Sequence, residues 1–338
     1  MRFTIAKPSD KMSHGSLFYS LPSDEAENQA MDKLEAICRE KADKRNAGRI
    51  EKELEAIKMT SSAMSVLIMY EIAALSKELG YPTALFGMES GMYIMELLGI
   101  SNVQTADYEN DKTPSELAVT DMIFGKGVIF TLAIAEPVRE HIQSRLNERF
   151  GQTDCNNEFF RRSDLPRGDI LEQIGKLSAK TGVPYNTVDY RSQDVLKDLF
   201  EDICKNDLRQ NTYLKHGLTP MELARLYAFA RCNHTDEVLF SDVRNYVLRE
   251  DIYRAVRDKG CVAPEALRFS RNWSRGRKKE LDIELLEQYD LPENLFYCYK
   301  KLSNLWSAAP CLARTNAMAT LLYYKQLDSA LFHKIVKE

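Results

Sequence analysis

A dense basic segment in the last third of the chain carries the side chains best suited to chemistry with nucleic acid. Between positions 268 and 279 there are six cationic residues and no acidic residue, with a tryptophan among them. Lysine and arginine neutralise backbone phosphates, and an aromatic ring stacks on an unpaired base. The residues predicted to bind DNA are Arg268, Arg271, Trp273, Arg275, Arg277, Lys278 and Lys279. The alternative is a solvated loop or helix end.

Acidic residues offer a second kind of chemistry, the binding of hard cations. Asp107, Glu109 and Asp111 alternate along the chain as they do in a calcium-binding loop. Such a loop also needs glycine at its sixth position and a carboxylate at its twelfth, which here is Ala118. The spacing therefore favours a solvated acidic loop.

Cysteine and histidine give no metal-binding spacing. The seven cysteines and five histidines are dispersed, and no C-x-x-C pair occurs. We therefore expect no zinc site and no cofactor, and unpaired thiols that fit a reducing, cytoplasmic environment. The most apolar run, 63–75, is interrupted by Glu71 and is shorter than the about 20 residues that span a bilayer, so no membrane partner is expected.

Composition and charge are those of an ordinary globular protein. The chain is 44% hydrophobic and 28% charged, which is enough to build a sizeable core. Residues 218–338 hold 19 basic and 16 acidic side chains, a balance of +3, whereas residues 1–217 hold 27 and 34, a balance of -7. This asymmetry is too small to predict DNA binding by itself.

Hydrophobic periodicity predicts a mainly α-helical fold with a small sheet. Residues 1–30 are polar and are expected to form a mostly extended arm, with a short strand at 2–6. The other predicted elements are helices at 30–58, 61–79, 89–98 and 136–150, a strand at 127–134, and helices from 170 onward. Thr219-Pro220-Met221-Glu222 has the form of a capping box with proline at the first helical position.

A series of short motifs follows Leu218 in a definite order. They are Leu218-Thr219-Pro220, His234-Thr235-Asp236, Arg249-Glu250-Asp251-Ile252, Arg275-Gly276-Arg277-Lys278-Lys279, Tyr289-Asp290-Leu291-Pro292, Cys298-Tyr299-Lys300-Lys301-Leu302 and Leu322-Tyr323-Tyr324-Lys325. Their order and spacing, over about 120 residues, resemble the fingers region of the alpha subunit of bacterial DNA polymerase III, of the PolC type. The resemblance implies that this part is a helical fingers-like domain.

The N-terminal half resembles the palm of the same family. Arg49-Ile50-Glu51-Lys52-Glu53-Leu54 is similar to the R-x-E-x-E-L helix that precedes the family's nucleotide-binding loop. The loop itself, G-S-R-G-S-x-G-S in the family, is replaced by Phe86-Gly87-Met88-Glu89-Ser90-Gly91-Met92. A glycine-rich turn cradles phosphates with its main-chain amides. Here the arginine is absent, and Glu89 would repel a triphosphate.

The family's metal site has lost most of its ligands in this chain. The family holds two metal ions with a P-D-I-D strand and a third aspartate, so that both the attacking and the leaving oxygens are clamped. The strand falls on residues 129–132, and we assign Ile129 and Thr131 as the degenerate active-site positions. The third aspartate falls on Asp164, which is either a surviving metal ligand or a solvated or capping residue in a loop. One carboxylate is too few for two hard cations.

The resemblance implies three regions. They are an extended arm at 1–30, a palm-like α+β domain at 31–210 and a helical fingers-like domain at 211–338, with the boundary near 205–218. It favours a catalytically inactive polymerase-like protein that binds DNA or a replication protein, in a replication or mobile-element setting.

Two alternatives remain open. The chain could be an active nucleotidyltransferase that uses Mg²⁺ or Mn²⁺ on relocated carboxylates, such as Asp121 or Glu136 with Asp164. It could also be a protein-only scaffold whose acidic N-terminal half docks a partner.

Overall fold

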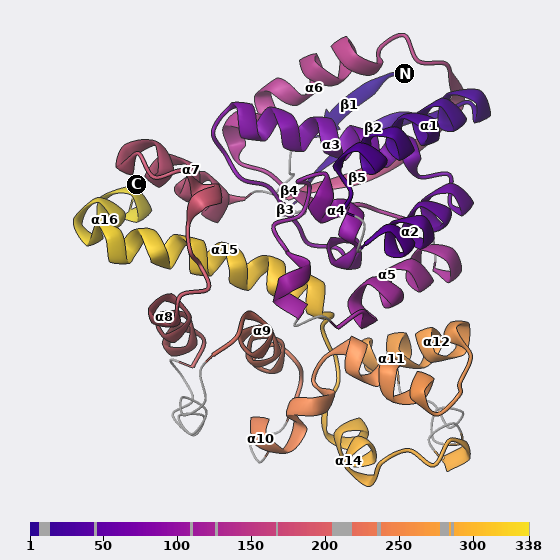
Figure 1. The fold of residues 1–338 in the computed structure, drawn as a ribbon, viewed down its shortest axis with the longest axis vertical. Coiled ribbons are helices and arrows are strands. Elements are labelled where there is room, and N and C mark those ends of the chain that lie inside the picture. The colour runs from indigo at the N-terminus through magenta and orange to yellow at the C-terminus, as the bar shows by residue number, and fades with distance from the viewer. Residues whose placement is uncertain are drawn as a thin grey trace.

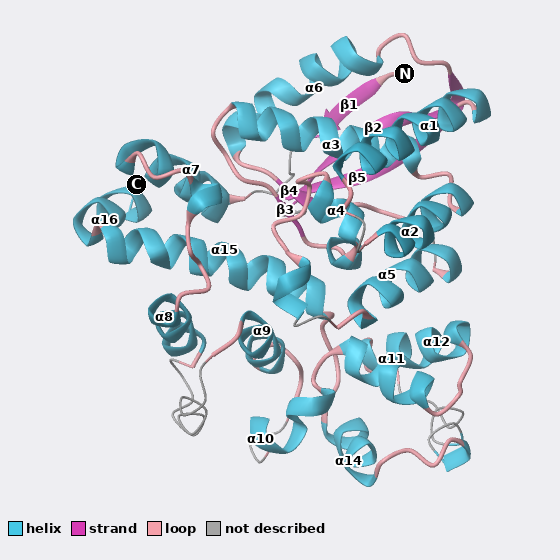
Figure 2. Ribbon diagram, in the orientation of Figure 1, coloured by secondary structure: helices cyan, strands magenta, loops and turns pink. Residues whose placement is uncertain are grey.

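The computed structural model describes residues 1–6, 14–43, 46–108, 111–125, 128–166, 168–204, 218–234, 238–277, 284 and 287–337. Helices make up most of these residues, and the strands are few and mostly short (Figures 1 and 2). The predicted mainly α-helical fold is therefore confirmed.

A three-stranded antiparallel sheet organises the N-terminal part of the molecule. Its order is β1 (Phe3–Ala6), β2 (His14–Pro22) and β5 (Cys155–Pro166). Three helices lie around it: α1 (Asp24–Lys41), α3 (Ala63–Glu78) and α6 (Glu136–Phe150), as Figure 1 shows. Tyr19 on β2 is buried and donates its hydroxyl to Ser65 of α3 at 2.8 Å, which ties the sheet to the helices.

The predicted arm at 1–30 is wrong beyond its first strand. The short strand is confirmed as β1. It does not belong to an extended arm, however, because every residue of β1 pairs with β2. The helix α1 then begins at Asp24, because the Ser23 side chain caps it by accepting a hydrogen bond from the Ala26 main chain at 3.2 Å.

The predicted helix at 30–58 is divided into two. α1 ends at Lys41 and α2 spans Ala47–Met59. Between them the Asp43 carboxylate accepts a hydrogen bond from the Asn46 main chain at 3.0 Å. A short polar side chain that bonds its own backbone in this way favours a turn over a continuous helix.

A second, two-stranded sheet lies next to the first. It pairs β3 (Ala84–Leu85) with β4 (Leu132–Ala133). The predicted strand at 127–134 is thus much shorter within the described residues, and Gly127 lies outside them. The remaining N-terminal elements are α2, η1 (Met88–Gly91), α4 (Tyr93–Leu97), η2 (Thr105–Tyr108) and α5 (Thr113–Phe124).

The described residues from 168 onward are mainly helical, as predicted. Their elements are α7 (Asp169–Thr181), η3 (Tyr185–Thr187), α8 (Gln193–Ile203), α9 (Pro220–Phe229), α10 (Phe240–Val243), η5 (Arg244–Tyr246), α11 (Arg249–Asp258), α12 (Ala263–Ser274), α14 (Glu293–Lys301), α15 (Ala308–Leu327) and α16 (Ser329–Lys337). The predicted cap of α9 is present, since the Thr219 side chain accepts a hydrogen bond from the Glu222 main chain at 3.2 Å.

The helix α15 connects the parts of the molecule. It crosses the centre of Figure 1 and packs against α7, α8, α9, η1 and β3. Three hydrophobic cores result: one around the N-terminal sheet, one among α8 to α15, and one where α7 and α16 meet α15. The predicted domain boundary falls mostly on residues 205–217, outside the described residues, so the division at 210 stays a prediction.

No single helix of the described residues is long and apolar enough to cross a membrane. The pair α2 and α3 meets the length and composition together but bends by 114° between the two helices.

Candidate functional site

The positions that the resemblance assigns to a metal site lie side by side. Thr131 forms an isolated parallel bridge with Asp164, and the Asp164 main-chain N–H donates to the Phe130 carbonyl at 2.8 Å. Ile129 lies two residues before Thr131, and its side chain is 52% exposed. Because side chains two residues apart on an extended segment point to the same side, Ile129 and Thr131 share a face beside the strand of Asp164.

Asp164 lies on β5, so its predicted setting in a loop is wrong. Its carboxylate forms an ion pair with Arg162 at 2.7 Å. Arg161 points elsewhere and donates to the Ser65 hydroxyl at 3.0 Å, and Arg167 lies outside the described residues. The single carboxylate at this position therefore already has a cationic partner.

The carboxylates considered as relocated metal ligands are engaged elsewhere. Asp121 on α5 accepts from Arg249 and Arg271, and Glu136 at the start of α6 pairs with Arg139 at 3.3 Å. Within the described part of the chain, no three His, Cys, Asp or Glu side chains come together as potential metal ligands. The relocated-carboxylate hypothesis gains no support from these residues.

The predicted phosphate loop is held by the helix that resembles the family's motif. Arg49 on α2 donates to the Gly91 carbonyl at 2.9 Å. The buried Glu53 carboxylate accepts from the main-chain N–H groups of Tyr93 at 2.9 Å and Ile94 at 2.8 Å. Two motif residues thus fix the end of the loop and the start of α4.

Glu89 folds back into that loop. Its Oε2 atom lies 2.0 Å from the place that a side chain on Gly87 would occupy, and it has no hydrogen-bond partner among the described residues. Burial, together with the nearby charge of Asp121, raises the pKa of Glu89 to about 7. The loop therefore presents a buried carboxyl group in the region where the family binds phosphate.

An arginine pair joins this loop to the C-terminal helices. Arg249 at the start of α11 is buried, donates to the Met88 sulfur at 2.9 Å and lies 3.2 Å from Asp121. Arg271 on α12 pairs with the same Asp121 carboxylate. One carboxylate balances only part of the charge of two guanidinium groups, and the Arg271 side chain is 18% exposed, so its contact with DNA stays a prediction.

Trp273 is not placed to stack on a DNA base, so this predicted contact is wrong. Its side chain is fully buried, and its indole Nε1 donates to the Leu302 carbonyl at 3.0 Å. The ring packs edge-on against Phe269 and Tyr299. The aromatic residue of the basic segment is therefore a core residue. It lies on the apolar face of α12, which packs toward the interior as in other amphipathic helices.

The remaining cations of the basic segment are on the surface. Arg268 is 49% exposed and lies 3.5 Å from Glu265. Arg275 and Arg277, at the end of α12, are exposed and pair with no carboxylate of the described residues. Lys278 and Lys279 lie outside the described residues. Three of the predicted DNA contacts are thus on the surface.

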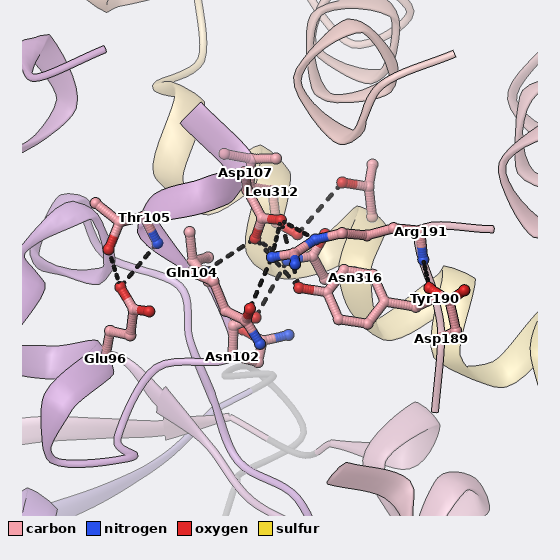
Figure 3. Close-up of polar contacts among 12 residues, drawn as sticks. Glu96, Asn102, Gln104, Thr105, Asp107, Asp189, Tyr190, Arg191, Leu312 and Asn316 are labelled. Carbon is pink, nitrogen blue, oxygen red and sulfur yellow. Dashed lines mark hydrogen bonds and ion pairs between the residues drawn. The ribbon is translucent and has the colours of Figure 1, made fainter. Parts of the chain in front are cut away.

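Asp107 was predicted to lie in a solvated acidic loop, and this is wrong. It is buried in η2 and accepts hydrogen bonds from Arg191 at 2.8 Å and from Asn316 on α15 at 2.8 Å, as Figure 3 shows. The main chain of Gln104 donates to it at 2.9 Å. A cleft of about 800 Å³ lies beside this network. Asp107 is therefore a structural anchor between η2 and α15.

A further group of side chains was not predicted from the sequence. Arg314 on α15 lies over the rings of Phe86 and Trp306, and Arg231 lies over the ring of Tyr227. We call these five residues the Arg–aromatic cluster. They come from four separate segments, so no spacing along the chain reveals them.

The sequence matches no protein-family model, and no curated protein is significantly similar to it.

Proposed function

We propose that this protein is a catalytically inactive relative of the polymerase III alpha subunit that binds DNA. The observation that carries the proposal is the arrangement of Ile129, Thr131 and Asp164. Thr131 forms a main-chain bridge with Asp164 on β5, although the whole of α6 separates them in the sequence, and Ile129 lies two residues before Thr131. The resemblance alone assigns these three positions to one metal site.

The same arrangement supports the loss of catalysis. Two of the three side chains carry no carboxylate, and the third pairs with Arg162. Two-metal phosphoryl transfer needs several oxygen ligands at this place. The predicted phosphate loop also holds the Glu89 carboxyl group, which is unfavourable for a triphosphate.

DNA binding is supported by the end of α12. Arg268, Arg275 and Arg277 are exposed there, and the chain continues directly into Lys278 and Lys279. When several such cations contact DNA phosphates, they release the counterions condensed on the DNA, and this release increases the affinity of the protein for DNA.

The test replaces Arg275, Arg277, Lys278 and Lys279 together by alanine. Each phosphate contact that is lost should reduce the salt slope of DNA affinity by about one, so we expect weaker binding and a flatter salt dependence. The matched control replaces four exposed cations on α1, α2 and α3 by alanine: Lys33, Lys52, Lys58 and Lys77. Equal affinity of both variants and the wild type, measured by fluorescence anisotropy on a primer–template, would remove the α12 residues from the proposal.

A further inference from the structure

We propose that the Arg–aromatic cluster is a binding site for one nucleotide unit of single-stranded DNA, with the phosphate held by Arg231 and Arg314 and the base against Trp306. This inference rests on the proposed function, but it concerns residues that the basic segment does not contain.

The cluster alternates cations and rings. The Arg314 guanidinium carbon lies 4.1 Å from the Phe86 ring centre and 5.2 Å from that of Trp306. Trp306 meets Tyr227 edge-on at 6.5 Å, and Arg231 lies 4.4 Å from the Tyr227 ring centre. Alternating guanidinium and aromatic groups are the components that sequence-tolerant sites for single strands use.

The two arginines lack acidic partners among the described residues. No ion pair within the described part of the chain involves either of them, and Arg314 donates a hydrogen bond to the Pro310 carbonyl at 3.3 Å. Burial lowers the pKa of Arg314, and the charge of Arg231 lowers it further. The site therefore holds positive charge that the described protein residues do not balance, and an anionic ligand would balance it.

The Trp306 backbone is fixed rather than loose. Its carbonyl accepts from the Arg249 main chain at 3.0 Å, and Leu248 and Trp306 form a parallel bridge. Three residues earlier, Ser303 exchanges two main-chain hydrogen bonds with Asn233. Trp306 is half-buried, so part of its surface stays accessible although its backbone is held in place.

The cluster begins at the degenerate metal site. The Phe86 main-chain N–H donates to the Thr131 carbonyl at 2.8 Å. From Phe86 the cluster passes through α15 to the end of α9, where Arg231 is exposed. A strand bound along it would run from the palm-like sheet toward the C-terminal helices.

Tryptophan fluorescence tests the site directly. The chain has two tryptophans, and Trp273 is fully buried, so a ligand that stacks on Trp306 should quench its emission. The probe is an unlabelled oligothymidylate of about 12 nucleotides, within the usual site size of a single-strand-binding domain. We expect quenching in the wild type and little or none in Trp306→Phe. The same oligonucleotide with a fluorescent label gives the affinity by anisotropy.

Charge reversal provides the second variant, because Arg231 is exposed and Arg231→Glu should fold. We expect its affinity to fall about tenfold or more, which corresponds to the loss of one phosphate or stacking contact. The matched control is Lys52→Glu on α2, with an expected change below about twofold. Unchanged affinity in Arg231→Glu, or unchanged quenching in Trp306→Phe, would overturn the inference.

The outcomes separate the two proposals. Binding that the α12 variant weakens and Arg231→Glu does not would leave the proposed function standing without this site. Binding that responds to Arg231→Glu alone would support this site and remove α12 from the account. A wild-type protein that binds no DNA would overturn both.

Discussion

Glu89 is a buried carboxyl group at the junction of the predicted phosphate loop and the C-terminal helices. Its Oε2 atom lacks a hydrogen-bond partner in the part of the chain that the structure describes, and burial raises its pKa from 4.5 to about 7. The folded protein keeps this proton over a pH range in which the unfolded chain has already lost it. The free energy of unfolding should therefore fall as the pH rises from about 4.5 to about 7.

We expect Glu89→Gln to remove this part of the pH dependence. Near pH 5 the variant and the wild type should have similar stability, whereas at pH 8 the variant should be more stable by up to about 3 kcal/mol. Glu250, whose pKa burial also raises to about 7, keeps its own contribution in both proteins. Urea unfolding at several pH values measures the difference, with the exposed Glu55→Gln as control. Parallel profiles of Glu89→Gln and the wild type would contradict the account.

The residue types predicted which side chains carry charge, but not which of them stay accessible to a ligand and which pair with other residues of the protein. Arg271 and Arg275 belong to the same basic segment, yet Arg271 pairs with Asp121 from a helix 150 residues earlier. Trp273 faces inward on α12 while Arg275 is exposed. Partners of this kind depend on tertiary packing, so neither the Asp121 pairing nor the Arg–aromatic cluster is visible in the order of residues.

Among the elements, α7 lies unusually close to the segment after α3. A side chain on Gly175 in α7 would come within 2.3 Å of the Tyr81 ring and 3.1 Å of the Gly80 carbonyl. By contrast, the space around Gly48 in α2 is open, with no heavy atom within 4 Å. The two glycines therefore separate the effect of close packing from that of helix propensity.

We expect Gly175→Ala to reduce the free energy of unfolding by about 1–3 kcal/mol, because α7 or Tyr81 must shift to make room. Gly48→Ala should be neutral or stabilising by up to about 1 kcal/mol, because alanine favours a helix. Chemical denaturation of both variants measures the contrast. If both substitutions stabilised the protein equally, the close contact between α7 and Tyr81 would be wrong.

Elements with strong local signals were predicted and those with weak signals were not. The cap at Thr219 marks the start of α9 as predicted. Gly182, with a φ of 72°, ends α7 in the left-handed conformation that glycine favours. The strand β5 was missed because its sequence, CNNEFFRRSDLP, is mostly polar and lacks regular alternation. Its partner β2 forms in the polar segment that was predicted to be an arm.

For the whole molecule, the mainly α-helical fold followed from periodicity, but the way α15 joins the parts did not. This C-terminal helix packs on β3, η1, α7, α8 and α9, which are long-range contacts in the sequence. The Asp107–Asn316 hydrogen bond spans 209 residues and reinforces the same connection. The N-terminal sheet region and the C-terminal helices are therefore joined by α15, in addition to the packing of α11 and α12 on α5.

For the whole molecule, we propose DNA binding without DNA synthesis. The most direct measurement is fluorescence anisotropy of labelled single-stranded and primer–template DNA with the wild-type protein across a salt series. We predict binding in the micromolar range or tighter, with affinity that falls steeply as salt increases, as expected for several phosphate contacts. No binding to either DNA at low salt would contradict it and would favour a protein-only scaffold.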